Sequence, residues 1–134
     1  MKDCSSLVIG GKQFSSRLMV GTGKYKSTKD MVESLSNSEA EIITIIGNST
    51  KEYSGLIINP AAFTHTSLGI YDALKAISTK VPCVEVHLSN THQREEIRHK
   101  SLTAAACIGQ IMGFKGYGYI LGLQALLKYI DQES

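Results

Sequence analysis

Two short stretches of this sequence end apolar runs with side chains of the kinds that transfer protons and hold anions. The first is Ile57–Ser67, which reads IINPAAFTHTS, and the second is Glu85–Asn90, which reads EVHLSN. Each begins like a strand and ends in small polar residues with a histidine among them. Because ligands of parallel α/β sheets bind at the carboxyl ends of strands, the pattern predicts one polar site built from two strand ends.

Glu85 and His87 are the best candidates for proton transfer in this pattern. They lie two residues apart, so on a strand both side chains point to the same face of the sheet. A carboxylate in that position can orient the imidazole and favour its protonated form, which suits a general acid. The alternative is a polar pair at a strand end that takes no part in a reaction.

The elements that must position these residues are predicted to alternate between strand and helix, which is typical of an α/β fold. We expect a short amino-terminal hairpin around Gly10-Gly11, a strand at residues 17–20 and a helix with Ser27 as its N-cap. The remaining prediction comprises strands at 41–46, 56–58, 81–86 and 104–113, a helix capped by Thr66 or Ser67, and a helix over 116–130. Periodicity alone leaves 104–113 ambiguous between buried helix and buried strand, and the alternation favours a strand.

The connection between the predicted strands 41–46 and 56–58 is irregular, because only nine residues join them. A crossover between parallel strands normally takes a dozen or more residues and usually contains a helix. We therefore expect one crossover helix to be missing. The sheet face that carries Ile43 and Ile45 would then be left open, and an open apolar face favours association into a homo-oligomer.

Composition indicates one compact domain of 134 residues with a formal net charge of +2. The charges of the two signs are interspersed, which argues against nucleic acid as a partner. Cys4, Cys83 and Cys107 show no CxxC spacing, which is typical of a cytoplasmic protein. Neither an export signal nor an apolar run long enough to cross a membrane is recognised.

The order and spacing of several motifs make residues 54 to about 131 similar to the carboxyl-terminal half of type II 3-dehydroquinate dehydratases. The motifs are IINPAAFTHTS, VEVHLSN, REEIRHKS and GFKGYGY. The resemblance implies a flavodoxin-like, doubly wound parallel sheet in three layers and a dodecamer of trimers. It also implies the conversion of 3-dehydroquinate to 3-dehydroshikimate and water, a step of the shikimate pathway, without a cofactor or metal.

The same resemblance implies roles for individual residues. His87 would be the general acid, Glu85 its partner, and Asn59 the residue that holds the water or substrate oxygens near the enolate. Taken alone, Asn59 is equally an ordinary turn asparagine before a proline. The substrate-binding residues implied are His65, the backbone N–H of Leu88, the hydroxyl of Ser89, Arg98, and Asp72 acting across a trimer interface. The alternatives are a loop histidine at position 65 and a helix-surface acid at position 72.

The amino-terminal third departs from this family, since the asparagine-rich loop and the lid that carries an arginine and the catalytic tyrosine are not recognised. Residues 7–46 instead resemble the opening of thiazole synthase, a (β/α)8 barrel whose Schiff-base lysine lies beyond the matched region, so that activity is rejected. The chain is interpreted as one domain with a thiazole-synthase-like segment 1–46, a connection 47–55 and a dehydroquinase-like segment 56–134.

Tyr25 distinguishes two hypotheses for the function. It stands just before the first predicted helix, between Lys24 and Lys26, which could lower its pKa and make it a substitute base. In that case the chain is a type II dehydroquinase that the loss of the lid has impaired. If Tyr25 is only an exposed loop tyrosine, the chain is instead a non-catalytic chimeric or truncated protein that keeps the fold and part of the anion pocket.

Overall fold

The structure, a computed structural model, describes residues 7–9, 12–14, 19–21, 38–51 and 53–133. Strands β1 (Leu7–Ile9) and β2 (Lys12–Phe14) pair antiparallel, with Leu7 opposite Phe14. The predicted amino-terminal hairpin is therefore confirmed. The helix predicted after Ser27 falls outside the described residues.

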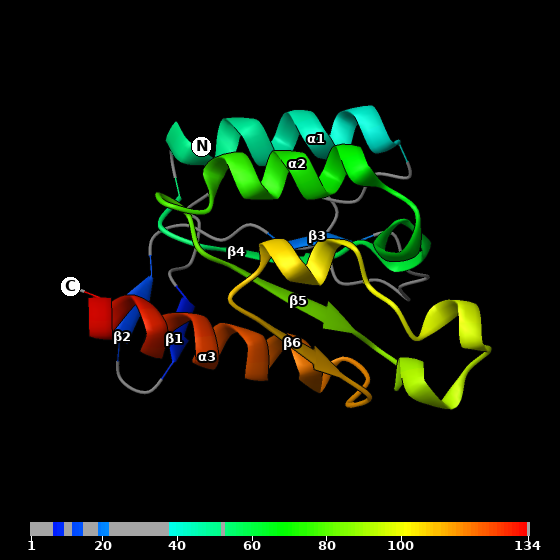
Figure 1. The fold of residues 1–134 in the computed structure, drawn as a ribbon. Helices are drawn as coiled ribbons and strands as arrows, with labels where there is room; N and C mark the ends of the chain where they lie inside the picture. The colour runs from blue at the N-terminus through cyan, green and yellow to red at the C-terminus, as the bar shows by residue number, and fades with distance from the viewer. Residues whose placement is uncertain (1–6, 10–11, 15–18, 22–37, 52, 134) are drawn as a thin grey trace.

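The main sheet has four parallel strands in the order β3-β4-β5-β6 (Figure 1). They are β3 (Met19–Gly21), β4 (Leu56–Asn59), β5 (Cys83–His87) and β6 (Gly109–Met112). Gly21 pairs with Asn59, Ile58 with Glu85, and His87 with Met112. Because all four strands run the same way, Asn59 and His87 come to the same edge of the sheet.

Helices cover both faces of this sheet. Helices α1 (Glu39–Asn48) and α2 (Leu68–Ile77) lie side by side on one face, and α3 (Tyr117–Glu133) lies on the other (Figure 1). Each face has its own apolar core, one centred on Ile42, Ile58 and Ile70 and the other on Val84, Val86 and Leu126. The predicted three-layer, flavodoxin-like α/β fold is thus confirmed.

Residues 41–46 were predicted to form a strand, and this prediction is wrong, because they lie within helix α1. Ile42 and Ile46, one helical turn apart, are completely buried in the core. Isoleucine and threonine favour strands, but burial of a helical stripe outweighs that weak preference. The sequence did carry a helix signal, since Ser38 and Glu41 have capping-box spacing and the Ser38 side chain accepts from the Glu41 N–H at 3.4 Å.

The missing crossover helix was also a wrong prediction, because α1 itself lies between β3 and β4 along the chain. Residues 49–55 connect a helix to a strand and need no crossover. Ile43 and Ile45 pack against the core of that face rather than lying on an open sheet. The physical reason given above for association is therefore withdrawn.

The segment 104–113 is a strand only in its second half. Thr103–Ala106 form a 3₁₀ turn, η6, and β6 follows from Gly109. The helix cap left open between two residues is Ser67, whose hydroxyl accepts from the Ile70 N–H at 2.9 Å. Helix α3 begins at Tyr117, next to its predicted start. Within the described part of the chain, no helix is long and apolar enough to cross a membrane.

Candidate active site

The carboxyl ends of β4 and β5 bring the two predicted catalytic motifs together. Asn59 ends β4 and is 3% exposed, whereas Glu85 and His87 on β5 are 0% and 6% exposed. Pro60 follows Asn59 and has no N–H to continue the ladder, so the chain turns away at this point. Three polar side chains are thereby buried at one edge of an apolar sheet.

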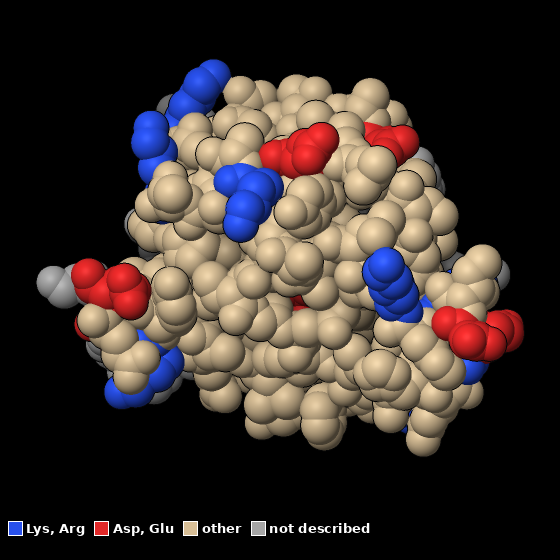
Figure 2. Space-filling model, viewed as in Figure 1, with Lys and Arg blue, Asp and Glu red and all other residues tan. Residues whose placement is uncertain are grey.

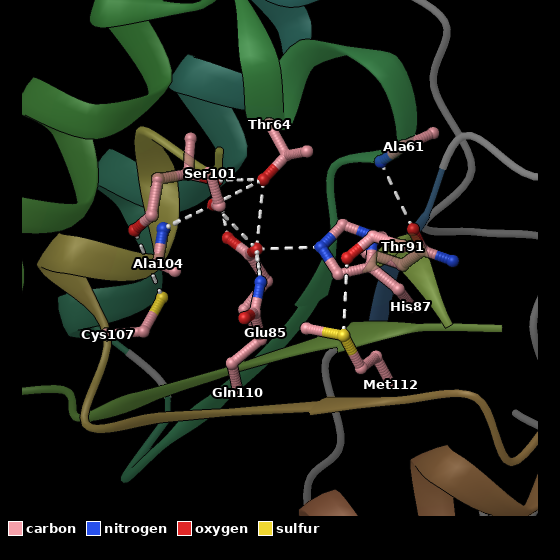
Figure 3. Close-up of polar contacts among 12 residues, drawn as sticks. Ala61, Thr64, Glu85, His87, Thr91, Ser101, Ala104, Cys107, Gln110 and Met112 are labelled. Carbon is pink, nitrogen blue, oxygen red and sulfur yellow. Dashed lines mark hydrogen bonds and ion pairs between the residues drawn. The ribbon is translucent and has the colours of Figure 1, made fainter. Parts of the chain in front are cut away.

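Glu85 and His87 form a direct pair. The ring nitrogen Nε2 of His87 lies 2.7 Å from Oε1 of Glu85 (Figure 3). With Nε2 donating to the carboxylate, the other ring nitrogen, Nδ1, is left to face a substrate. The predicted same-face arrangement of these two residues is therefore present in the structure.

Four neutral side chains surround the carboxylate of Glu85 in addition to His87. Oε1 accepts from the Thr64 hydroxyl at 2.9 Å, the Ser101 hydroxyl at 2.9 Å and the Gln110 amide at 2.7 Å (Figure 3). Oε2 accepts from the Thr103 hydroxyl. A buried carboxylate is tolerated when its oxygens receive such bonds.

The pKa of Glu85 is set by two opposing effects. Burial raises this pKa, but the hydrogen bonds from His87, Thr103 and Ser101 and the charge of His87 outweigh burial and hold it below its ordinary value. The carboxylate consequently stays ionised at neutral pH, in contact with the imidazole that it orients.

Local turns place the donors around Glu85. Thr64 lies in the 3₁₀ turn η3 (Ala61–His65), and its backbone carbonyl accepts from the Leu102 N–H at 2.7 Å. Ser101 accepts from the Ala104 N–H at 2.9 Å, which fixes the start of η6. Gln110 is opposite Glu85 in the register of β5 and β6.

Asn59 is held from both sides of its amide. Its Oδ1 accepts from the Ala61 N–H at 3.1 Å, and its Nδ2 donates to the Tyr119 hydroxyl at 2.9 Å. The first bond closes a tight turn in which Ala61 has a φ of 49°, a conformation that favours glycine. Backbone strain of this kind often accompanies functional sites, and here it fixes the side chain of Asn59.

The predicted substrate-binding residues lie around the site without forming one cluster. His65 is half-buried and its Nδ1 is 2.7 Å from the carbonyl oxygen of Lys100. Leu88 directly follows His87 and packs against the α3 side of the core, and Ser89 is exposed.

Arg98 and Asp72 have surface positions. Arg98 ends the 3₁₀ turn η5 (Glu96–Arg98), and its Nε donates to Oε2 of Glu95 at 3.0 Å. Asp72 is exposed on α2, whose buried stripe includes Ile70 and Leu74. Tyr25, the predicted substitute base, lies outside the described residues.

Charged side chains on the face shown in Figure 2 lie singly or in groups of mixed sign. Arg94 and Arg98 flank Glu95, for example, with Nε to Oε2 distances of 3.8 and 3.0 Å. The described residues contain no group of three or more His, Cys, Asp or Glu side chains that could hold a metal ion.

The sequence interpretation missed five residues that contact the candidate catalytic side chains. They are Thr64, Ser101, Thr103, Gln110 and Tyr119. Thr64 and Tyr119 lie inside motifs that were recognised, but no role was assigned to them. Gln110 would have been found from the strand pairing, since it stands opposite Glu85.

Comparisons with known proteins agree with this arrangement. A family model described as class II dehydroquinase matches residues 13–127. A 3-dehydroquinate dehydratase from Clostridium perfringens is 62% identical over 99 residues, which cover 73% of this chain and 66% of the relative. Another, from Clostridium acetobutylicum, is 55% identical over 97 residues, covering 72% of this chain and 66% of the relative. The chain thus spans about two thirds of the length of these relatives.

Solved structures show the same likeness. The type II dehydroquinase from Butyrivibrio crossotus matches with a TM-score of 0.67 and 41% identity, over 69% of this chain and 64% of that one. The type II dehydroquinase from Propionibacterium acnes matches with a TM-score of 0.64 and 37% identity, over 70% of this chain and 68% of that one. Neither comparison bears on the resemblance of residues 7–46 to thiazole synthase.

Proposed function

Because this chain belongs to the class II dehydroquinase family, we propose that it is a lyase that eliminates water from 3-dehydroquinate to give 3-dehydroshikimate. The observation that carries this proposal is the buried pair of Glu85 and His87, with an Nε2 to Oε1 distance of 2.7 Å. It lies at the same edge of the sheet as Asn59. The proposed setting is the shikimate pathway of aromatic amino acid biosynthesis, in the cytoplasm.

The second half of the elimination suits the described residues. Once a base has taken the α-proton, the enolate must expel a hydroxyl group, which leaves readily only when it is protonated. Nδ1 of His87 would supply this proton while Glu85 stabilises the imidazolium. Asn59 would hold the water or enolate oxygens through its amide.

The first half of the elimination requires a base, and we assign it to Tyr25 or to water. Tyr53, another tyrosine considered for this role, precedes the amino end of β4 and therefore lies at the opposite edge of the sheet from Asn59. It is accordingly not proposed. Without the family's lid, proton abstraction would be the slow step, and the enzyme would be impaired.

Substrate binding is assigned to His65, Leu88, Ser89 and Arg98. His65 would contact the hydroxyls, and the backbone N–H of Leu88 with the Ser89 hydroxyl would hold the carboxylate. Arg98 would have to leave Glu95, which it contacts at 3.0 Å, to reach an anion. Asp72 would complete the site of a neighbouring subunit, because it is exposed on α2.

The proposed assembly is a homo-oligomer built from trimers, with the dodecamer as the largest form. The proposed division of the chain is a segment 1–46 similar to thiazole synthase, a connection 47–55 and a dehydroquinase-like segment 56–134. The parallel pairing of β3 with β4 supports the idea that the first segment replaces the family's own first strand, because Gly21 lies opposite Asn59. No metal or cofactor is proposed to take part.

A second candidate function is a non-catalytic protein that keeps the fold and part of the anion pocket. The observation that favours it is the limited coverage, since this chain spans only 66% of the Clostridium perfringens relative. In that case the Glu85–His87 pair would bind an anion without turnover.

A steady-state assay separates the two candidates, because 3-dehydroshikimate contains a conjugated enone that absorbs in the ultraviolet. We expect slow turnover of 3-dehydroquinate that His87→Ala abolishes. A positioned proton donor typically contributes 10²–10⁴-fold to the rate, about 3–5 kcal/mol of barrier. Binding of substrate by calorimetry without any turnover would instead favour the non-catalytic protein.

The base is tested in the same assay by Tyr25→Phe. If Tyr25 is the base, this variant loses the residual rate, whereas if water is the base, the rate depends on His87 alone. A full rate that is unchanged in Tyr25→Phe would contradict both assignments and would direct attention to Lys24 or Lys26.

A further inference from the structure

The carboxylate of Glu85 is completely buried, yet it meets few charged groups. The donors that reach it from other segments are neutral: the hydroxyls of Thr64, Ser101 and Thr103 and the amide of Gln110. They come from three separate parts of the chain, namely η3, the stretch that contains η6, and β6. We name these four side chains the Glu85 cage.

The members of the cage also bond to one another. The hydroxyl oxygen of Thr64 lies 2.6 Å from that of Ser101 and 2.8 Å from that of Thr103. Each hydroxyl has one proton and can both donate and accept, so a closed group of hydroxyls orients itself around the one full acceptor, the carboxylate. Thr64 and Thr103 are 0% exposed, so water does not replace them easily.

We propose that the Glu85 cage, and Thr103 above all, keeps Glu85 ionised inside the core and thereby keeps His87 competent as a proton donor. These residues touch Glu85 rather than substrate, so they are positioning residues. Thr103 is central because it donates to Oε2, whereas His87, Thr64, Ser101 and Gln110 all approach Oε1. The kinetic part of this inference rests on the proposed dehydratase function, but the protonation state of Glu85 does not.

The titratable groups near Glu85 lie on few elements. On its own strand they are His87, which bonds to it, and Cys83; Cys107, after η6, lies against Cys83. The donors that η3 and β6 direct at Glu85 are neutral, and so are Ser101 and Thr103. Removing a cage hydroxyl therefore changes the solvation of Glu85 without adding or removing a charge.

Thr103→Val removes the hydroxyl with little change in shape, and Thr103→Ser restores it. The matched control is Thr91→Val, because Thr91 is also buried, at 7% exposure, and its hydroxyl donates to the Met112 sulfur instead of Glu85. Gln110→Leu serves as a second test, since Gln110 is half-buried on β6 and its loss disturbs the core less.

The direct measurement is a ¹³C NMR titration of the Glu85 side-chain carboxyl in the resting protein. We expect its midpoint to move to higher pH in Thr103→Val and Gln110→Leu, and to stay at the parent value in Thr103→Ser and Thr91→Val. If Thr103→Val does not fold, Gln110→Leu decides. An unmoved midpoint in the folded cage variants would overturn the inference, whether or not the protein is a dehydratase.

The kinetic measurement is the pH profile of kcat and of KM. Protonation of Glu85 at higher pH should move the acid limb of kcat upward in Thr103→Val and lower kcat at pH 6 on the order of tenfold, with KM unchanged. A purely structural role would lower kcat equally at every pH, and this result would contradict the proposal. A parent protein without activity, but with the expected NMR shifts, would refute the proposed function and leave the inference standing.

Discussion

The backbone at Ala61 is strained, and the strain supports the position of Asn59. Ala61 has a φ of 49° and its N–H donates to Oδ1 of Asn59 at 3.1 Å. Left-handed backbone costs a residue with a Cβ roughly 1–2 kcal/mol, of which glycine pays little. The site therefore stores a small amount of energy next to a candidate catalytic residue.

We expect Ala61→Gly to stabilise the protein by about 0.5–1 kcal/mol, because the relief of strain exceeds the added entropy of the unfolded chain. Urea unfolding measures the difference. The control is Ala62→Gly in the same 3₁₀ turn, where φ is not positive and glycine should destabilise. Equal effects of the two substitutions would show that the backbone at position 61 is not strained.

The lowered pKa of Glu85 makes its contribution to stability depend on pH. A carboxyl group whose pKa is lower in the folded state stabilises the protein above its unfolded pKa, and this stabilisation is lost as the pH falls through the folded pKa. We expect Glu85→Gln to destabilise by about 1–3 kcal/mol at pH 7, and by progressively less below about pH 4. Urea unfolding at several pH values tests this, and a gap that is constant with pH would contradict it.

Arg98 and Glu95 compete with any anionic substrate, because they form an ion pair at the surface. Arg98→Ala should weaken binding of a dehydroquinate-like anion by on the order of 1.5–3 kcal/mol, whereas Glu95→Gln should strengthen it by releasing the arginine. Calorimetry measures both. Arg94→Ala is the control, since Arg94 is exposed and contacts the same glutamate at 3.8 Å. Equal losses in Arg94→Ala and Arg98→Ala would remove Arg98 from the site.

At the scale of elements, helix α1 is what most separates the structure from the sequence prediction. Ile42, Thr44 and Ile46 would share one face of a strand, but on the helix Thr44 is exposed and points away from the two buried isoleucines. This difference gives a simple test of the helical assignment.

We expect Ile46→Ala to destabilise by about 2–5 kcal/mol, as deletion of a buried isoleucine side chain does. Thr44→Ala should change stability by no more than about 0.5 kcal/mol, because exposed helix positions are tolerant. Thermal unfolding compares the two variants. Losses of similar size would indicate a strand with both residues on its inner face.

The parts of the fold that sequence predicted well are those with a single dominant signal. The strand of Leu56–Asn59 and the helix after Ser67 combine continuous burial or helical spacing with a clear boundary at Pro60 or at the cap. Residues 41–46 gave two conflicting signals, β-branched side chains and a capping box, and the wrong one was followed. The Glu85 cage could not be predicted, because Thr64, Ser101 and Gln110 meet only through tertiary folding.

At the scale of the whole molecule, the case for assembly now rests on exposed apolar side chains rather than on an open sheet. Phe114 is 57%, Tyr117 is 56% and Ile120 is 45% exposed, and all three lie at or before the start of α3. Apolar side chains gathered at one end of a helix are typical of surfaces that associate. We expect a homo-oligomer at micromolar concentration, and a monodisperse monomer by light scattering would contradict this.

The proposed role of Asp72 across subunits has a direct test by complementation. Asp72→Asn and His87→Ala should each be inactive alone, but mixed oligomers should regain activity. A subunit that keeps His87 would then receive Asp72 from its neighbour. Recovery after mixing and reassembly, measured by the enone assay, is the expected result. Full activity in Asp72→Asn alone would show that Asp72 takes no part in the site.

Strand β6 lies at one end of the strand order in the described sheet, and it carries Gln110. Edge strands open locally at a lower free energy than global unfolding requires, so their backbone amides exchange with solvent sooner. Each such opening of β6 would withdraw one donor from a carboxylate that is 0% exposed. The charge at the centre of the site is therefore only as durable as the hydrogen-exchange protection of the strand at its rim.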